Sequence, residues 1–191
     1  MFWIEAVAAI LGVISVCMMT RQQPLAWPIG LAMVLLYIGV FYDARLYSEM
    51  LLQSVYALLQ GYGWWRWLYG GRDKGQQLAV TALPAARVLR DLAVGLLITL
   101  ILGGVMSQWT NANMPWLDAA LTGFSLVGQY WMANKRIQCW PLWLVLDVVY
   151  VGMFVALGLH MTALLYLVFA GLAAYGWWQW WQPLAGQERP A

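Results

Sequence analysis

Apolar residues form long stretches along the chain, and short polar segments interrupt them. An α-helix needs about 20 mostly apolar residues to cross the hydrocarbon core of a bilayer. Seven stretches come close to that length, and each predicts a membrane-spanning helix. They lie at residues 3–20, 25–42, 47–69, 91–108, 116–134, 140–158 and 161–183. The pattern therefore predicts an all-α integral membrane protein with seven transmembrane helices.

The composition excludes the soluble classes of protein. Of 191 residues, 63% are hydrophobic and 9% are charged, whereas a soluble domain has about 25% charged residues. So few charges could not cover a soluble globule, and they also exclude a disordered protein and a nucleic-acid binder. The two cysteines, Cys17 and Cys139, are too few for a disulfide framework, and we interpret both as buried thiols.

The basic residues indicate the orientation of the chain, because cytoplasmic loops of membrane proteins are rich in lysine and arginine. With the polar segment 70–90 in the cytoplasm, alternation of the helices leaves only Arg45 outside and places the other nine basic residues inside. These nine are Arg21, Arg66, Arg72, Lys74, Arg87, Arg90, Lys135, Arg136 and Arg189. We expect a multi-pass membrane protein with its N-terminus outside and its C-terminus in the cytoplasm.

An internal repeat divides the chain. The segment Tyr62-Gly63-Trp64-Trp65-Arg66-Trp67 recurs 113 residues later as Tyr175-Gly176-Trp177-Trp178-Gln179-Trp180. Over residues 27–67, 17 of 41 positions are identical at this offset without a gap. One intervening helix returns the second copy to the orientation of the first, so the copies are expected to be parallel, as in one class of transporters.

The repeat predicts a 3+1+3 arrangement of the helices. Residues 1–69 form the first three-helix repeat. Residues 70–110 form a cytoplasmic loop and linker helix, and residues 111–191 form the second three-helix repeat with a short cytoplasmic tail. In such proteins the substrate lies near the midplane, between the repeats.

Four polar side chains lie inside the apolar spans and are not shared by the two copies: Gln53, Gln60, Gln129 and Asp147. Such side chains are costly in a bilayer and are usually functional. From the rise of an α-helix per residue, we expect Gln60, Gln129 and Asp147 to lie at one depth in the membrane, slightly to the cytoplasmic side of the midplane. Aromatic residues share their helix faces. The candidate substrate-binding residues are therefore Gln53, Tyr56, Gln60, Trp64, Gln129, Trp140, Trp143, Asp147 and Tyr150.

This mixture of side chains favours a flat, polar and cationic ligand. Aromatic rings stack on such a ligand and attract its charge, while amides and a carboxylate fix its orientation. The sequence shows no nucleophile–base pair, metal cluster or phosphate-binding loop. We therefore expect neither an enzyme, nor a metal site, nor a bound cofactor.

Each of these residue types also has a structural alternative. Tryptophans near helix ends commonly form a belt at the membrane interface, and we assign to it Trp65, Trp67, Trp177, Trp178 and Trp180. Glutamines can hydrogen-bond neighbouring helices, and His160 falls in an outer turn. The alternative to a transporter is a membrane receptor or assembly protein whose polar residues only join helices.

The sequence resembles the Pnu family of bacterial vitamin transporters, best known for uptake of nicotinamide riboside. The matching features are the motif from Tyr62 to Trp67, the stripe from Gln53 to Trp64, the run Gln129-Tyr130-Trp131, and Trp140-x-x-Trp143-x-x-x-Asp147. The resemblance covers residues 3–180. It implies the 3+1+3 fold, facilitated diffusion, trapping of the vitamin by a cytoplasmic kinase, and a homotrimer. It also implies substrate contacts at Gln60, Trp64, Trp140 and Trp143.

One residue departs from the family pattern. Nicotinamide riboside members carry asparagine where this chain has Asp147, and related members carry thiamine or riboflavin. Nicotinamide riboside and thiamine are cations, so a carboxylate suits both, whereas riboflavin is neutral and bulkier. We therefore expect a small cationic vitamin, with nicotinamide riboside first, thiamine as the alternative and riboflavin less favoured.

Overall fold

The structure, a computed structural model, describes residues 2–43, 47–71, 78–109 and 114–187. Seven α-helices make up almost all of the described chain, which confirms the expected all-α class. They are α1 (Phe2–Thr20), α2 (Ala26–Asp43), α3 (Tyr47–Tyr69), α4 (Ala85–Trp109), α5 (Pro115–Ala133), α6 (Cys139–Ala156) and α7 (His160–Gln187). Three of the helices are long and apolar enough to cross a membrane by length and composition alone: α4, α6 and α7. α3 and α5 carry three of the four polar residues singled out above, which lowers their apolar content.

The expected span 91–108 begins earlier than the sequence indicated. α4 starts at Ala85. The carbonyl oxygen of Pro84 accepts hydrogen bonds from the backbone amides of Arg87, at 2.9 Å, and Val88, at 3.2 Å. The two arginines of this region, Arg87 and Arg90, therefore lie on the helix and not in a loop. The sequence boundary was wrong because charged residues were taken to end the span.

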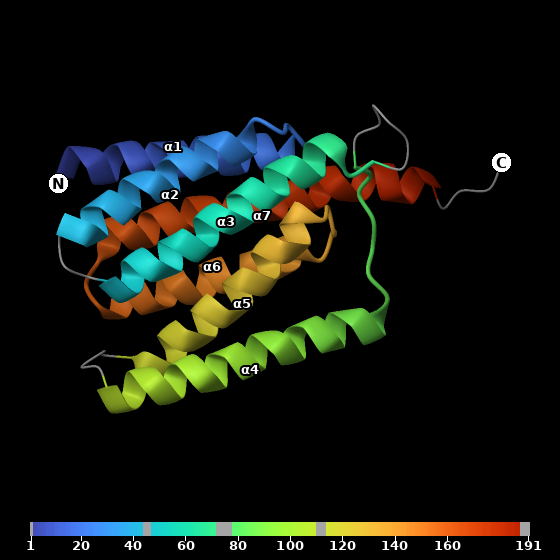
Figure 1. Cartoon of the computed structure of the whole chain (residues 1–191). Helices are drawn as coiled ribbons and strands as arrows, with labels where there is room; N and C mark the ends of the chain where they lie inside the picture. The colour runs from blue at the N-terminus through green and yellow to red at the C-terminus, as the bar shows by residue number, and fades with distance from the viewer. Residues whose placement is uncertain (1, 44–46, 72–77, 110–113, 188–191) are drawn as a thin grey trace.

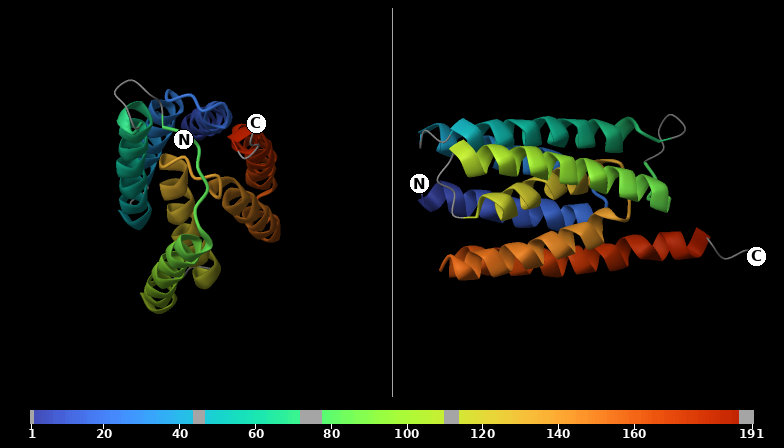
Figure 2. Two further views of the ribbon diagram at one scale, coloured as in Figure 1. Left: turned by 90° about the vertical axis from the view of Figure 1, so that its right-hand side faces the viewer. Right: turned by 90° about the horizontal axis from the view of Figure 1, so that it is seen from below.

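Six helices form a closed ring, and α4 lies outside it. Around the ring, α1 packs on α2, α2 on α3, α3 on α5, α5 on α6, α6 on α7, and α7 on α1. In the described chain α4 packs on α5 and on no other helix. Its peripheral position is plain in the end-on view (Figures 1 and 2). The ring encloses the space in which a substrate site was expected.

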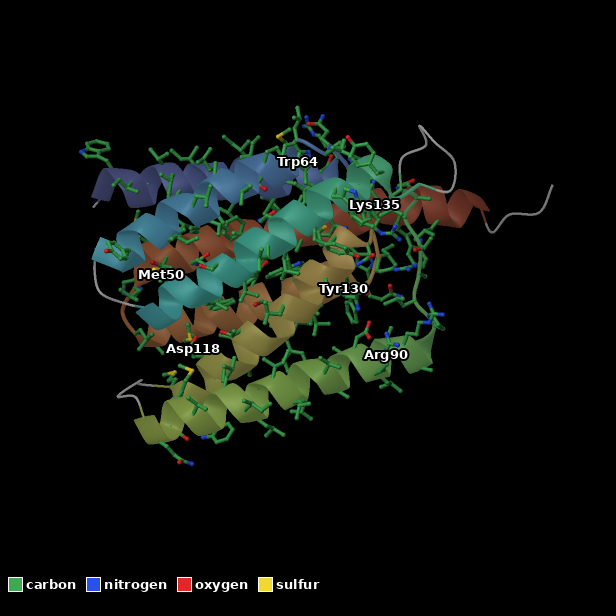
Figure 3. All side chains as sticks on the ribbon, viewed as in Figure 1. Met50, Trp64, Arg90, Asp118, Tyr130 and Lys135 are labelled. Carbon is green, nitrogen blue, oxygen red and sulfur yellow. The ribbon has the colours of Figure 1, made fainter. Side chains whose placement is uncertain are left out.

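All six basic residues in the described part of the chain gather at one end of the bundle, which we call the basic end. They are Arg21, Arg66, Arg87, Arg90, Lys135 and Arg136. Figure 3 shows Arg90 and Lys135 at this end and Asp118 toward the opposite end. The remaining basic residues of the orientation argument, Arg45, Arg72, Lys74 and Arg189, lie outside the described residues.

The turns after α1 and α5, both at the basic end, have the same backbone structure. Gln22 and Lys135 adopt left-handed φ angles of 57° and 48°, which non-glycine residues rarely do. Their amides donate to the carbonyls of Met19 and Met132, respectively, each at 3.0 Å. The Lys135 ammonium also donates to the Gln22 side-chain oxygen at 3.2 Å, across a sequence separation of 113 residues. The two turns thus match at the repeat offset and touch each other.

Four fully buried tryptophans pack next to these turns: Trp27, Trp67, Trp140 and Trp180. The Trp27 and Trp67 rings meet edge to face at 5.4 Å, and the Trp140 and Trp180 rings do so at 5.2 Å. Trp67 and Trp180 also approach each other, at 5.9 Å. We call these four residues the tryptophan cluster.

Two of the cluster residues correct an expectation. Trp67 and Trp180 were assigned to the interfacial belt, but both are fully buried. The indole of Trp67 donates to the Met132 carbonyl at 3.1 Å, and that of Trp180 donates to the Thr20 carbonyl at 3.1 Å. Trp67 therefore joins α3 to α5, and Trp180 joins α7 to α1. The other three residues assigned to the belt, Trp65, Trp177 and Trp178, are exposed.

Candidate substrate site

A central cavity of about 510 Å³ lies inside the ring of six helices. Every ring helix contributes to its wall, and α4 does not. Eight of the nine candidate residues line it: Gln53, Tyr56, Gln60, Gln129, Trp140, Trp143, Asp147 and Tyr150. The volume falls in the ordinary range for small-molecule sites.

The ninth candidate, Trp64, does not reach the cavity. Its neighbour Gly63 faces Trp27 so closely that an added Cβ would lie 2.2 Å from the indole ring. Trp64 is turned about 100° from that direction by the helical pitch, and 38% of its surface is exposed. The family-based assignment of a substrate contact to Trp64 has no support in this arrangement.

Among the described residues, the charged side chains of the cavity wall are all acidic. Asp118 and Asp147 line the cavity, and no lysine, arginine or histidine does. Asp147, on α6, is 4% exposed and makes no ion pair or hydrogen bond to another described side chain. An isolated carboxylate is costly in a low-dielectric site, so a cationic ligand would find a complementary partner there.

Sequence reasoning missed Asp118. It lies in the first turn of α5, where acidic residues commonly serve only to complement the helix dipole. Nothing in its position along the chain distinguishes these two roles. Its place on the cavity wall depends on how α5 packs in the ring.

Two buried polar atoms on the cavity side chains have no protein partner in the described structure. These are the amide oxygen of Gln60 and the indole nitrogen of Trp140. The first can accept a hydrogen bond and the second can donate one. Buried polar atoms are usually satisfied, so a ligand that uncovers these two atoms would find one acceptor and one donor. The amide nitrogen of Gln60 lies close to Gly30, where an added Cβ would be 2.7 Å away.

Other polar contacts fix the wall between α3 and α5. The Tyr56 hydroxyl hydrogen-bonds the Ser125 hydroxyl, which also interacts with the Thr122 carbonyl at 2.9 Å. Part of the polar surface is therefore already satisfied by protein, on the side of the cavity between α3 and α5.

Aromatic rings cover the α6 and α7 side of the cavity. The Tyr150 ring lies 5.9 Å from Phe154, nearly parallel to it, and 4.5 Å from Tyr166. Trp143 packs on Gly128 of α5, where an added Cβ would lie 3.2 Å from the indole. The candidate residues included Tyr150 and Trp143 but neither Phe154, which the helical pitch places on the same face of α6, nor Tyr166 on α7.

The tryptophan cluster adjoins the cavity toward the basic end. Trp140 belongs to both the cavity wall and the cluster. Behind the cluster, the Lys135 ammonium lies 4.6 Å from the centre of the Trp67 ring, and the residue is 1% exposed. Burial lowers the pKa of Lys135 to about 8. The Lys135 ammonium thus places a positive group at the basic end of the bundle, whereas the charged residues of the cavity wall are acidic.

Comparison with known proteins identifies a family. Residues 2–182 match the model of a family described as nicotinamide mononucleotide transporter. The nicotinamide riboside transporter PnuC of Escherichia coli K12 is 26% identical over 93% of this chain and 84% of its own length. The riboflavin/roseoflavin transporter RibM of Streptomyces davaonensis is 27% identical over 98% of this chain and 89% of its own length.

A solved structure has the same fold. The crystal structure of the vitamin B3 transporter PnuC aligns with a TM-score of 0.75 and 23% sequence identity. The alignment covers 98% of this chain and 83% of that one. These similar proteins are transporters and not enzymes, in agreement with the expectation from the sequence.

Proposed function

Because the chain belongs to the nicotinamide mononucleotide transporter family, we propose that it carries a small cationic vitamin, nicotinamide riboside, across the bacterial inner membrane. The observation that carries this assignment is the acidic and aromatic cavity wall. Asp118 and Asp147 supply negative charge without a basic residue among the described lining side chains. Aromatic rings and glutamine side chains complete a lining suited to a cationic ring with a sugar attached.

In this proposal each group has a separate task. The nicotinamide ring stacks on Trp143 and the neighbouring aromatic rings, close to Asp147. The ribose hydroxyl groups bond to the amide oxygen of Gln60 and the indole nitrogen of Trp140, which lack protein partners and become accessible as the ligand binds. Gln53, Gln129 and Tyr56 bound the remaining space.

Other vitamins of the family are distinguished by charge. Thiamine is a cation and is the alternative substrate on the same grounds. The similarity to RibM makes riboflavin a third candidate, but a neutral isoalloxazine would leave the two carboxylates without a charged partner. A membrane receptor without transport is disfavoured by a cavity that spans the middle of the ring.

Transport itself is proposed to be facilitated diffusion. A cytoplasmic kinase would phosphorylate the vitamin and prevent its return, as the family resemblance implies. We place the basic end in the cytoplasm, since positive charge is enriched on that side of membrane proteins. This gives a periplasmic N-terminus and a cytoplasmic C-terminus, and a homotrimer is the assembly that the resemblance implies.

The parallel repeat belongs to the same proposal. It is supported by matched contacts at an offset of 113 residues: the paired turns at Gln22 and Lys135, and the paired glycine–tryptophan contacts of Gly63 with Trp27 and Gly176 with Trp140. A pseudo-two-fold axis along the membrane normal would relate the halves, with the cavity on that axis.

Purified protein in detergent provides the test of the substrate. Thermal unfolding is measured with nicotinamide riboside, thiamine and riboflavin, and uptake of labelled vitamin is measured in proteoliposomes. We expect nicotinamide riboside to give the largest stabilisation and an uptake that stops when its concentrations inside and outside are equal. Preferential stabilisation by riboflavin, or accumulation driven by a proton or sodium gradient alone, would contradict the proposal.

A further inference from the structure

We propose that a second, smaller cleft at the basic end binds the phosphate headgroup of an anionic phospholipid. This cleft lies between the start of α4 and the end of α5 and has a volume of about 60 Å³. Its polar lining comprises Arg87, Arg90, Asp91, Tyr130, Asn134 and Arg136. It shares no lining residue with the central cavity.

The cleft carries an excess of positive charge that the protein does not neutralise. Its one carboxylate, Asp91, pairs with Arg90 at 2.8 Å through one oxygen. The other oxygen accepts the indole N–H of Trp131 at 2.8 Å. Arg87 and Arg136 therefore have no carboxylate partner among the described residues. Guanidinium groups bind phosphate oxygens with matched geometry, so a phosphate would supply the missing negative charge.

Backbone contacts hold one wall of the cleft in place. The segment before α4 docks on the α5–α6 turn: the Thr81 amide donates to the Lys135 carbonyl at 3.0 Å, and the Ile137 amide donates to the Thr81 carbonyl at 3.1 Å. The Arg136 guanidinium donates to the Thr81 hydroxyl. The positive end of the α4 dipole adds to the field of the arginines at the same place.

The surroundings of the cleft favour a lipid over a free phosphate ion. α4 packs only on α5 among the described helices, and Leu89, Leu96 and Leu100 on α4 are exposed. Figure 3 shows Arg90 and Tyr130 at the same end of the bundle, on α4 and α5. Acyl chains can therefore follow the apolar surface of α4 while the headgroup occupies the cleft, and basic pockets between transmembrane helices bind headgroups of this kind.

Native mass spectrometry of the purified full chain tests the proposal. Phosphatidylglycerol is titrated in detergent against phosphatidylcholine, with inorganic phosphate as a separate arm. The wild type is compared with Arg87→Gln, with Arg87→Gln/Arg136→Gln, and with the control Arg21→Gln, which removes an exposed charge from the same end. We expect about fivefold weaker binding of phosphatidylglycerol for each cleft arginine removed, and little change for the control.

Arg87→Gln keeps the test decisive if the double variant fails to fold, because the Arg87 side chain is exposed and makes no hydrogen bond with the described residues. A preference of the wild type for phosphatidylglycerol that Arg87→Gln weakens and Arg21→Gln retains supports the site. An equal loss in both variants would overturn it, since the effect would then be one of general charge. Displacement of the lipid by millimolar inorganic phosphate would overturn the assignment to a lipid.

Discussion

At the scale of single residues, Asp147 has the clearest chemical role to test. Asp147→Asn keeps the shape of the side chain and removes a buried charge. If the carboxylate faces the cationic ring, binding of nicotinamide riboside should weaken by roughly 1–3 kcal/mol, the scale of a lost charge-assisted contact. Isothermal titration calorimetry measures this. The empty protein should keep or gain stability, because a buried carboxyl group without a protein partner is removed. Unchanged affinity would show that stacking and amides hold the ligand without the carboxylate.

Trp143 tests the contribution of stacking, with Trp178 as its matched control. Trp143 lines the cavity, whereas Trp178 is 58% exposed on the outside of α7. Trp143→Ala should weaken vitamin binding by roughly 1–3 kcal/mol, as loss of an aromatic platform does for a nucleobase. Trp178→Ala should leave it nearly unchanged. Equal affinities in both variants, each well folded, would place the site elsewhere.

Lys135 makes stability depend on pH. Its pKa is about 8 in the folded protein and 10.5 in the reference state, so the unfolded state binds more protons between these values. The free energy of unfolding should therefore rise with pH across that window, by about 1–3 kcal/mol from this group. Thermal unfolding of wild type and Lys135→Gln from pH 7 to 10.5 isolates the effect. A wild-type curve parallel to that of the variant would contradict it.

At the scale of the elements, two glycines on α3 predict opposite outcomes. An added Cβ at Gly63 would lie 2.2 Å from the Trp27 ring, whereas one at Gly61 would meet nothing within 4 Å. Gly63→Ala should separate α2 from α3 and cost about 1–3 kcal/mol of unfolding free energy by overpacking. Gly61→Ala should stabilise α3 by about 0.5–1 kcal/mol. Thermal unfolding in detergent compares the two, and stabilisation by both would show that the Trp27 contact can relax.

The helices and their polar residues were predictable to different degrees. The seven apolar stretches predicted the seven helices. Gln60, Gln129 and Asp147 were recognisable because polar side chains are rare in such stretches. The burial of Trp67 and Trp180 was not, since nearness to a helix end predicts a lipid interface. Their partners, Met132 and Thr20, lie in the opposite half of the chain. Only the packing of one half on the other reveals such contacts.

At the scale of the whole molecule, orientation gives a direct test. Cys17 and Cys139 are replaced by serine, and a cysteine is placed either at Gln23, exposed at the basic end, or at His160, exposed at the opposite end. A membrane-impermeant maleimide added to intact spheroplasts should label the variant at 160 and spare the one at 23. Both should react once the membrane is opened. Labelling of the cysteine at 23 alone in intact spheroplasts would invert the proposed topology.

The contact between Gln22 and Lys135 has a consequence for the ancestry of the molecule. Residues at equivalent positions of two copies can touch only on the axis that relates the copies. In a dimer of identical halves this site would bring a side chain against itself, and two lysines there would place like charges side by side in a dry interior. A lysine facing a glutamine resolves that conflict, but it requires the two copies to differ. If the halves descend from one unit, this pair could arise only after the two copies had become free to vary separately.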